Sequence, residues 1–161
     1  MFSASSYTGT REENYEVVIR QLEALITGEP DWIANLSNAS ALLNQFLDNI
    51  NWVGFYLMRD GELVLGPFQG LPACVRIPLG KGVCGTAAER RETELVPDVH
   101  QFPGHIACDA ASQSEIVVPI VSGENLLGVL DIDSPSLNRF DEIDQKYLEK
   151  FVQVLVGNHS S

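Results

Sequence analysis

Apolar side chains recur at intervals of three and four residues in both terminal parts of the chain, and this spacing is typical of one face of an α-helix. The first such stretch predicts a helix over residues 11–27, which ends at Gly28 and Pro30. A second helix is expected from about Asp31, a good N-cap residue, to about residue 49. After Ser134-Pro135, the amphipathic segment "FDEIDQKYLEKFVQVLV" with its acidic first turn predicts a terminal helix.

Shorter apolar runs in the middle of the chain are typical of β-strands. The segment "NWVGFYLMRDGELVLGPFQG" holds two such runs joined at Asp60-Gly61, which indicates a tight hairpin. In "EIVVPIVSGENLLGVLDID" two further strands flank residues 122–125. Short strands near 75–78 and 93–96 are expected, with a short helix in "VCGTAAERRE" between them. This order of elements predicts an α+β fold with a mainly antiparallel sheet and helices packed on one face.

The 161 residues favour a single domain. We expect a flexible N-terminal arm over residues 1–10 and one domain over residues 11–158. The first ten residues do not resemble a secretory signal, and no apolar run is long enough to cross a membrane, so a cytoplasmic protein is expected.

A strong excess of acidic residues limits the choice of partner. Twenty-two acidic and ten basic residues give a formal charge of −12, which would repel phosphate backbones and anionic lipid. Nucleic acid and membrane surfaces are therefore disfavoured, and a small-molecule ligand is expected.

Strand alternation gathers aromatic and acidic side chains on one face of the predicted sheet. Residues two apart on a strand project to the same side, about 6.5–7 Å from each other. Asp131 and Asp133 therefore share a face, as do Trp52 and Tyr56, and Glu115 can join them from the start of its strand. A solvated outer face would also carry acids at alternate positions, but large aromatic side chains usually cover something.

A carboxylate cluster on such a face has two natural uses. It can bind an ammonium group, or it can hold a proton at neutral pH because like charges raise one another's pKa. Both uses fit an amino-acid-like ligand. Hard cations, which also accept carboxylate oxygens, are the competing ligand.

The loop "DVHQFPGHIACD" contains His100, His105 and Cys108, which are residue types that bind zinc. Its spacing matches no common zinc pattern, so no metal is expected. We interpret His100 as a surface residue and His105 as a structural residue or one that tunes the thiol of Cys108.

Three cysteines, at positions 74, 84 and 108, are expected to be thiols in a reducing compartment. Small buried hydrophobic residues are the ordinary interpretation of free cysteines. Cys108 lies in a loop near "SQSE", where backbone amides could stabilise the nucleophilic thiolate. Cys74 and Cys84 lie beside turns that contain Gly or Pro, so either is a candidate for a mobile partner thiol. One nucleophile with one or two resolving thiols would make a redox cycle.

Motifs spread along the chain resemble one enzyme family. The segments "NWVGFYL", "GPFQG", "GKGVCGTA", "DVHQFPGHIACDAASQSEIVVPI" and "GVLDIDSP", followed by "FDEID", occur in the order found in free methionine-(R)-sulfoxide reductases, which are single GAF-domain enzymes. The resemblance covers about residues 14–156. It implies a GAF fold, with helices on one face of the sheet and a ligand pocket on the other.

The resemblance also implies a reaction, the reduction of free methionine sulfoxide to methionine. Cys108 would attack the sulfur and become a sulfenic acid, Cys74 would resolve it as a disulfide, and Cys84 would be an alternative or relay thiol. No bound cofactor is implied, and thioredoxin would be the electron donor. The preference for the R epimer follows from the resemblance alone, and the chain is expected to be a monomer or a homodimer.

The resemblance further implies roles for the residues of the acidic face. Trp52 and Tyr56 would wall the methyl-sulfur end of the substrate, while Glu115, Asp131 and Asp133 would bind its polar groups. Attack on a sulfoxide stalls unless the departing oxygen is protonated, so we expect Glu115 and Asp133 to share that proton and Asp131 to hold the ammonium group. The substrate carboxylate would meet backbone amides around residues 80–83 or 106–108. There are two alternatives. The chain could be a GAF module that only senses a ligand, or a thiol sensor without a substrate.

Overall fold

The computed structural model describes residues 6–105 and 110–160 of the chain. Its helices are α1 (Arg11–Ile26), α2 (Trp32–Phe46), α3 (Gly82–Arg90) and α4 (Glu142–Ser160), with a short 3-10 helix η1 (Val99–Gln101). Its strands are β1 (Trp52–Arg59), β2 (Glu62–Gly70), β3 (Arg76–Pro78), β4 (Glu94–Val96), β5 (Ser114–Ser122) and β6 (Asn125–Ser134). Residues 1–5 of the predicted N-terminal arm lie outside the described residues.

Capping side chains explain where the first two helices begin. The hydroxyl of Thr10 accepts a hydrogen bond from the Glu13 amide, and the Glu13 carboxylate accepts one from the Thr10 amide, which forms a capping box for α1. The predicted N-cap Asp31 is confirmed, since its carboxylate accepts from the Ala34 amide. Helix α2 ends at Phe46, about three residues before the predicted end.

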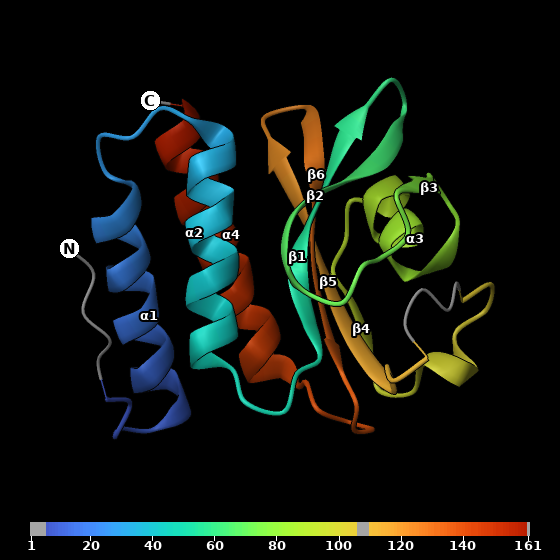
Figure 1. Ribbon diagram of the computed structural model, residues 1–161, viewed down its shortest axis with the longest axis horizontal. Helices are drawn as coiled ribbons and strands as arrows, with labels where there is room; N and C mark the ends of the chain where they lie inside the picture. Colours follow the sequence, from blue (N-terminus) through green and yellow to red (C-terminus); the bar gives the residue numbers. More distant parts are fainter. Residues whose placement is uncertain (1–5, 106–109, 161) are drawn as a thin grey trace.

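One six-stranded antiparallel sheet, in the order β3-β2-β1-β6-β5-β4, forms the centre of the molecule (Figure 1). The predicted hairpin at Asp60-Gly61 is confirmed. Both residues have positive φ, 52° and 82°, as a type I′ turn requires. The second predicted hairpin joins β5 to β6 through Gly123, whose φ is also positive.

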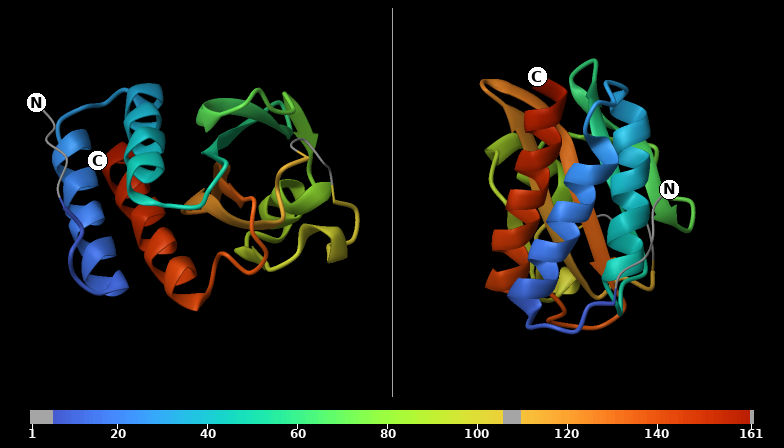
Figure 2. Two further views of the ribbon diagram at one scale, coloured as in Figure 1. Left: turned by 60° about the horizontal axis from the view of Figure 1, so that its bottom comes forward. Right: turned by 90° about the vertical axis from the view of Figure 1, so that its left-hand side faces the viewer.

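Three helices cover one face of the sheet, which confirms the α+β prediction. Helices α2 and α4 pack directly on the strands, and α1 lies on the outside of both (Figures 1 and 2). Strand residues on this face, among them Val53, Phe55, Leu130 and Ile132, are buried against the helices. Among the described helices, none is long and apolar enough to span a membrane.

The opposite face carries α3 and the long connections, around which the sheet curls (Figure 2). A second apolar cluster lies there, and it includes Trp52 and Tyr56 of β1 with Val83, Cys84 and Ala87 of α3. The side chains of β1 therefore alternate between the helix-covered face and the α3 face, as the sequence predicted. This second face holds the site.

An ion-pair cluster at the base of the helical layer joins α1 to α4. Asp144 is 2% exposed and accepts a hydrogen bond of 2.6 Å from the Tyr15 hydroxyl. Its other oxygen lies 3.0 Å from the Arg11 guanidinium and 3.8 Å from that of Arg139. Arg11 also forms a two-pronged ion pair with Asp141, both distances being 2.7 Å. Burial raises the pKa of Tyr15, with a further rise from Asp144, so its hydroxyl remains a donor.

Candidate functional site

A pocket opens on the α3 side of the sheet, and six residues predicted for the site line it together. They are Trp52, Tyr56, Cys84, Glu115, Asp131 and Asp133. The neighbouring walls come from the segment between β2 and β3, from the start of α3 and from His105. Three adjacent strands, β1, β6 and β5, thus supply the aromatic and acidic residues, and α3 supplies Cys84.

Strand register explains why the acids meet. Asp133 on β6 lies opposite Trp52 on one side and opposite Glu115 on the other. Asp131 lies opposite Gly54 and Val117. Gly54 has no side chain, and a Cβ there would meet the Phe68 Cβ at 2.2 Å, so this position must stay small for β1 and β2 to pair closely.

Stacked aromatic rings form one wall of the pocket. The rings of Trp52 and Tyr56 are stacked with centroids 5.9 Å apart. Phe68 on β2 also stacks on Trp52, with centroids 5.1 Å apart. Sequence reasoning missed Phe68, because counting the register outward from the Asp60-Gly61 turn pairs Gly54 with Pro67, and only an irregularity between Gly54 and Tyr56 brings Phe68 opposite Gly54. Gly70 has a φ of +143°, and a Cβ there would clash with the Trp52 ring. The absence of a side chain at Gly70 therefore leaves room for the indole.

The three carboxyl groups are buried and close to one another. Glu115 is 7% exposed, Asp131 5% and Asp133 9%. Burial raises the pKa of Glu115 well above its usual range, and the charges of Asp131 and Asp133 raise it further. Burial also raises the pKa of Asp131. The cluster therefore retains a proton at a pH at which exposed carboxyls have lost theirs.

One oxygen in this cluster is available to a ligand. Oδ1 of Asp131 is buried and has no hydrogen-bond partner among the described residues. A buried polar atom without a partner costs free energy, so this oxygen is a natural acceptor for a donor group of a bound molecule.

The cysteines of the described chain are in different states. Cys74, in the segment between β2 and β3, is disulfide-bonded. Cys84 is a free, buried thiol within α3. Burial raises its pKa well above the usual value, and Asp131 raises it further. The predicted nucleophile Cys108 lies outside the described residues.

The structure places Cys84, one of the two candidate partner thiols, inside a helix. The turn before it, at Gly80-Lys81-Gly82, is followed at once by the helix, and Cys84 lies in its first turn with a side chain only 5% exposed. Gly85 holds this turn against β3, because its amide and carbonyl bond to Lys81 and Gly80 and a Cβ at Gly85 would lie 2.4 Å from the Pro78 carbonyl oxygen.

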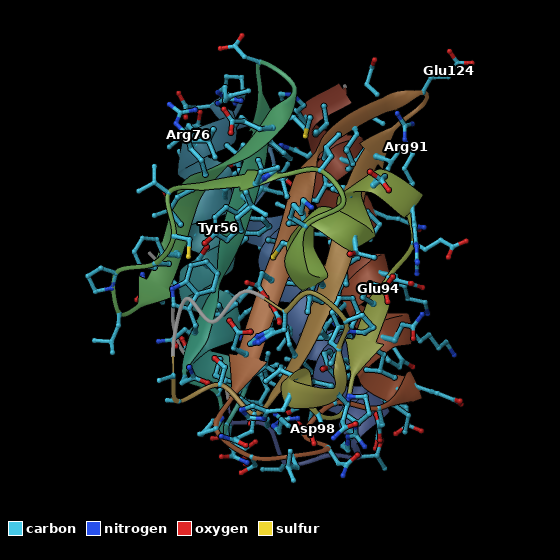
Figure 3. The ribbon with its side chains drawn as sticks, turned by 90° about the vertical axis from the view of Figure 1, so that its right-hand side faces the viewer. Tyr56, Arg76, Arg91, Glu94, Asp98 and Glu124 are labelled. Carbon is cyan, nitrogen blue, oxygen red and sulfur yellow. The ribbon has the colours of Figure 1, made fainter. Side chains whose placement is uncertain are left out.

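The aromatic wall also holds the segment that carries Cys74. The Tyr56 hydroxyl donates a hydrogen bond of 2.9 Å to the Cys74 carbonyl. The Trp52 indole donates one of 3.1 Å to the Leu71 carbonyl. Figure 3 looks onto this face and shows Tyr56 projecting from β1 toward that segment.

The N-terminus of α3 faces the pocket without a side-chain cap. Its N-cap residue Lys81 makes no side-chain capping bond, and Lys81, Gly82 and Val83 line the cavity. The first amides of a helix have no partner within the helix, and its dipole favours negative charge at this end. This edge of the pocket is therefore suited to an anionic group.

The two histidines are placed differently. His100 is a surface residue, as predicted, and its ring lies 3.1 Å from the Asp98 carboxylate. His105 lines the pocket, and burial lowers its pKa, with a smaller effect from His100. Among the described residues, the group that could offer metal ligands is Cys84, Glu115 and Asp131, whose ligand atoms lie within 4.8 Å of one another. Absence of a metal stays a prediction.

Comparisons with known proteins agree on one family. The family model described as "GAF domain" matches residues 36–155. The chain is 59% identical to Protein YtsP of Bacillus subtilis, covering 96% of each chain. It is 53% identical to the free methionine-R-sulfoxide reductase of Escherichia coli, covering 90% of this chain and 88% of the relative. The solved structure of fRMsr of Staphylococcus aureus in complex with substrate is 54% identical, with a TM-score of 0.88 over 96% of this chain and 99% of that one.

Proposed function

The chain belongs to the GAF domain family and, within it, to the free methionine-R-sulfoxide reductases, and we propose that it reduces free L-methionine-(R)-sulfoxide to L-methionine through a cysteine redox cycle. The observation that carries the proposal is the combination of a stacked aromatic wall, three buried carboxyls and a disulfide-bonded cysteine segment around one pocket. Together these parts meet four requirements of the reaction.

The first requirement is a place for the methyl-sulfur end of the substrate. A sulfoxide carrying a methyl group and an alkyl chain is apolar apart from its oxygen. The Trp52 and Tyr56 rings offer an apolar surface for it, and Phe68 stacks on Trp52 and supports the indole.

The second requirement is a proton for the departing oxygen. The Cys108 thiolate attacks the sulfoxide sulfur, the sulfur–oxygen bond of the substrate breaks, and the oxygen leaves as the hydroxyl of a cysteine sulfenic acid while methionine is released. This step consumes one proton. Glu115, whose pKa is raised by burial and by two neighbouring acids, is suited to hold that proton and to share it with Asp133.

The third requirement is recognition of a free amino acid. The ammonium group binds Asp131, whose buried Oδ1 has no partner among the described residues. The carboxylate binds the uncapped amides at the start of α3, at Gly82 and Val83. An N-acetylated or peptide-bound methionine sulfoxide lacks the ammonium group and is expected to be a poor substrate.

The fourth requirement is a second thiol that removes the sulfenic acid. Attack of the Cys74 thiol on the Cys108 sulfenic acid forms a disulfide and releases water. Cys74 suits this role better than Cys84, because Cys74 is disulfide-bonded while Cys84 is a free thiol buried in a helix with a raised pKa. Thioredoxin, a dithiol protein of the cytoplasm, then reduces the disulfide.

The test is turnover of free methionine-(R)-sulfoxide with thioredoxin, thioredoxin reductase and NADPH, in the wild type and in three Cys→Ser variants. Cys108→Ser is expected to form no methionine. Cys74→Ser is expected to form about one methionine per chain and then stop, and Cys84→Ser to turn over nearly as the wild type.

Controls separate this proposal from a sensor role. Free methionine-(S)-sulfoxide and N-acetylmethionine sulfoxide are tested under the same conditions and are expected to be poor substrates. A wild type that binds the sulfoxide but leaves it intact would support a sensor module instead. Loss of turnover in Cys84→Ser with full turnover in Cys74→Ser would assign the resolving role to Cys84.

A further inference from the structure

Two exposed apolar side chains lie on either side of the disulfide-bonded cysteine. Over residues 6–105 and 110–160, the large apolar residues that are exposed are Ile33, Leu71, Val75 and Leu137. Leu71 is 66% and Val75 59% exposed, and both belong to the five-residue segment that contains Cys74. Single exposed apolar residues are common on soluble proteins. Two beside a redox-active sulfur indicate a contact surface.

The backbone beneath these side chains is fixed from the inside of the molecule. The Leu71 carbonyl accepts from the Trp52 indole, the Cys74 carbonyl from the Tyr56 hydroxyl, and the Val75 carbonyl from the Leu65 amide at 2.9 Å. The segment is therefore held at its start, middle and end, with the Leu71 and Val75 side chains turned toward solvent. A surface that is already ordered loses little conformational entropy when a partner binds.

Basic side chains occur beside this segment although the chain as a whole is acidic. Arg76 follows Val75 directly and is exposed, in an ion pair with Glu62 at 3.2 Å (Figure 3). Lys81 lines the same pocket as Pro72 and Ala73. A formal charge of −12 repels an acidic partner at most of the surface, and these two cations reduce that repulsion here.

We propose that Leu71, Cys74 and Val75 form the docking surface for the dithiol protein that reduces the disulfide, and that this protein attacks the sulfur of Cys74. The inference rests on the proposed function, since only a catalytic disulfide has to be reduced in every cycle. Disulfide exchange passes through a mixed disulfide, so the sulfur of the partner must reach bonding distance and its surface must contact the side chains on both sides. The partner is thus a dithiol protein with an apolar surface around its nucleophilic cysteine.

The exchange is balanced in two steps. The partner's thiolate bonds to the Cys74 sulfur, the disulfide breaks, and the second cysteine of this chain leaves as a thiolate. The partner's other thiol then attacks its own sulfur in the mixed disulfide and releases Cys74, which takes up a proton. The partner is oxidised by two electrons, and the chain returns to two thiols. Attack at Cys74 regenerates the catalytic nucleophile directly in its reactive thiolate form.

The first test measures steady-state turnover as a function of thioredoxin concentration in a Leu71→Ser/Val75→Ser double variant. The KM for thioredoxin is expected to rise roughly tenfold, equivalent to about 1.4 kcal/mol of lost binding. Methionine formation in a single turnover and turnover supported by dithiothreitol, which needs no docking surface, are expected to stay as in the wild type. The matched control is Ile33→Ser/Leu137→Ser, which removes two exposed apolar side chains elsewhere and should leave the KM unchanged.

The second test maps the bond and needs no change in the surface. Thioredoxin whose resolving cysteine is replaced by serine is mixed with the oxidised wild-type protein, and the trapped mixed disulfide is digested and identified by mass spectrometry. The bond is expected on the peptide that contains Cys74. A bond on the peptide that contains Cys108, or an unchanged KM in the double variant, would overturn the proposal.

The two proposals fail in distinguishable ways. If dithiothreitol supports no turnover in the wild type, the proposed function itself is wrong. If dithiothreitol supports turnover while the double variant keeps the wild-type KM for thioredoxin, the enzyme assignment stands and the docking surface is wrong.

Discussion

The hydroxyl of Tyr56 donates a hydrogen bond of 2.9 Å to the backbone carbonyl of Cys74. One side chain of the pocket wall therefore also holds the segment that carries the proposed resolving thiol. Burial, together with the nearby acids, raises the pKa of Tyr56, so the phenol stays protonated and remains a donor over the working pH range. The proposed substrate contact and the position of the second cysteine are in this way linked through one residue.

Tyr56→Phe keeps the aromatic ring and removes this hydrogen bond. We expect disulfide formation after the first chemical step to slow by roughly threefold to tenfold, the equivalent of one neutral hydrogen bond of about 0.5–1.5 kcal/mol. Methionine release in a single turnover should change less, because the ring still contacts the substrate. Rapid-quench measurement of methionine and of free thiols separates the two steps.

Tyr7→Phe is the matched control, since it removes a hydroxyl that bonds to Gln21 far from the pocket. A Tyr56→Phe variant that forms its disulfide at the wild-type rate would show that the hydrogen bond does not position Cys74.

Glu115→Gln removes the proposed proton donor while nearly preserving its shape. The single-turnover rate of methionine formation is expected to fall by about a hundredfold or more, which is the usual range for loss of a general acid. Glu62→Gln, at a largely exposed ion pair, is the control and should keep the wild-type rate. Full turnover in Glu115→Gln would remove Glu115 from the mechanism.

Glu115→Gln is expected to be more stable than the wild type, and the difference in the free energy of unfolding should grow as the pH rises. The pKa of Glu115 is raised by folding, so the folded state holds a proton that the unfolded state loses near the ordinary carboxyl pKa. Above that pH the wild type loses up to about 1.4 kcal/mol of stability per pH unit, until the raised pKa of the folded state is passed. Glu115→Gln has no such proton to lose. Urea unfolding at pH 5 and pH 8 should show a gain in stability for the variant that is larger at pH 8, and an equal gain at both would contradict the raised pKa.

Two glycines in helices should respond to alanine in opposite directions. At Gly85 a Cβ would lie 2.4 Å from the Pro78 carbonyl oxygen, so Gly85→Ala must move α3 away from β3. We expect a loss of about 1–3 kcal/mol from this overpacking and weaker substrate binding, because the start of α3 lines the pocket. At Gly157 in α4 a Cβ would meet nothing within 4 Å, and alanine there should stabilise by about 0.5–1 kcal/mol. Thermal unfolding of the two variants checks both signs.

Asp144 is expected to be the acid on which the fold depends most outside the pocket. Asp144→Ala leaves the Tyr15 hydroxyl and the Arg139 guanidinium without their buried partner, at a cost of about 3 kcal/mol. Asp48→Ala, which removes an almost fully exposed carboxylate from the same arginine, should cost less than about 1 kcal/mol. Similar urea midpoints for the two variants would contradict the role of burial.

Local patterns predicted most of the architecture. The helices, both hairpins and the division of β1 into a helix-covered face and a pocket face follow from periodicities of 3.6 and 2 and from turn residues such as Asp60-Gly61. The same alternation placed Asp131 with Asp133 and Trp52 with Tyr56, because the side of a strand on which a residue lies is fixed by its position alone.

Contacts between distant segments could not be predicted in this way. Sequence reasoning missed the stacking of Phe68 on Trp52, and residue types alone did not separate Cys74 from Cys84, which the structure buries in α3. It also gave no indication that Tyr56 and Trp52 hold the segment from Leu71 to Val75. These relationships depend on strand order and on how α3 closes over the sheet, which no local window contains.

The sequence by itself determined the secondary structure, the face on which each strand residue lies and the residue types available for the chemistry, because these depend on local periodicity and composition. Only the tertiary structure decided that Glu115, Asp131 and Asp133 meet in one buried cluster, since strands β5 and β6 must pair in the observed register for Glu115 to lie opposite Asp133. The raised pKa of Glu115 likewise arises from burial and from neighbouring charges, and both of these exist only in the folded chain.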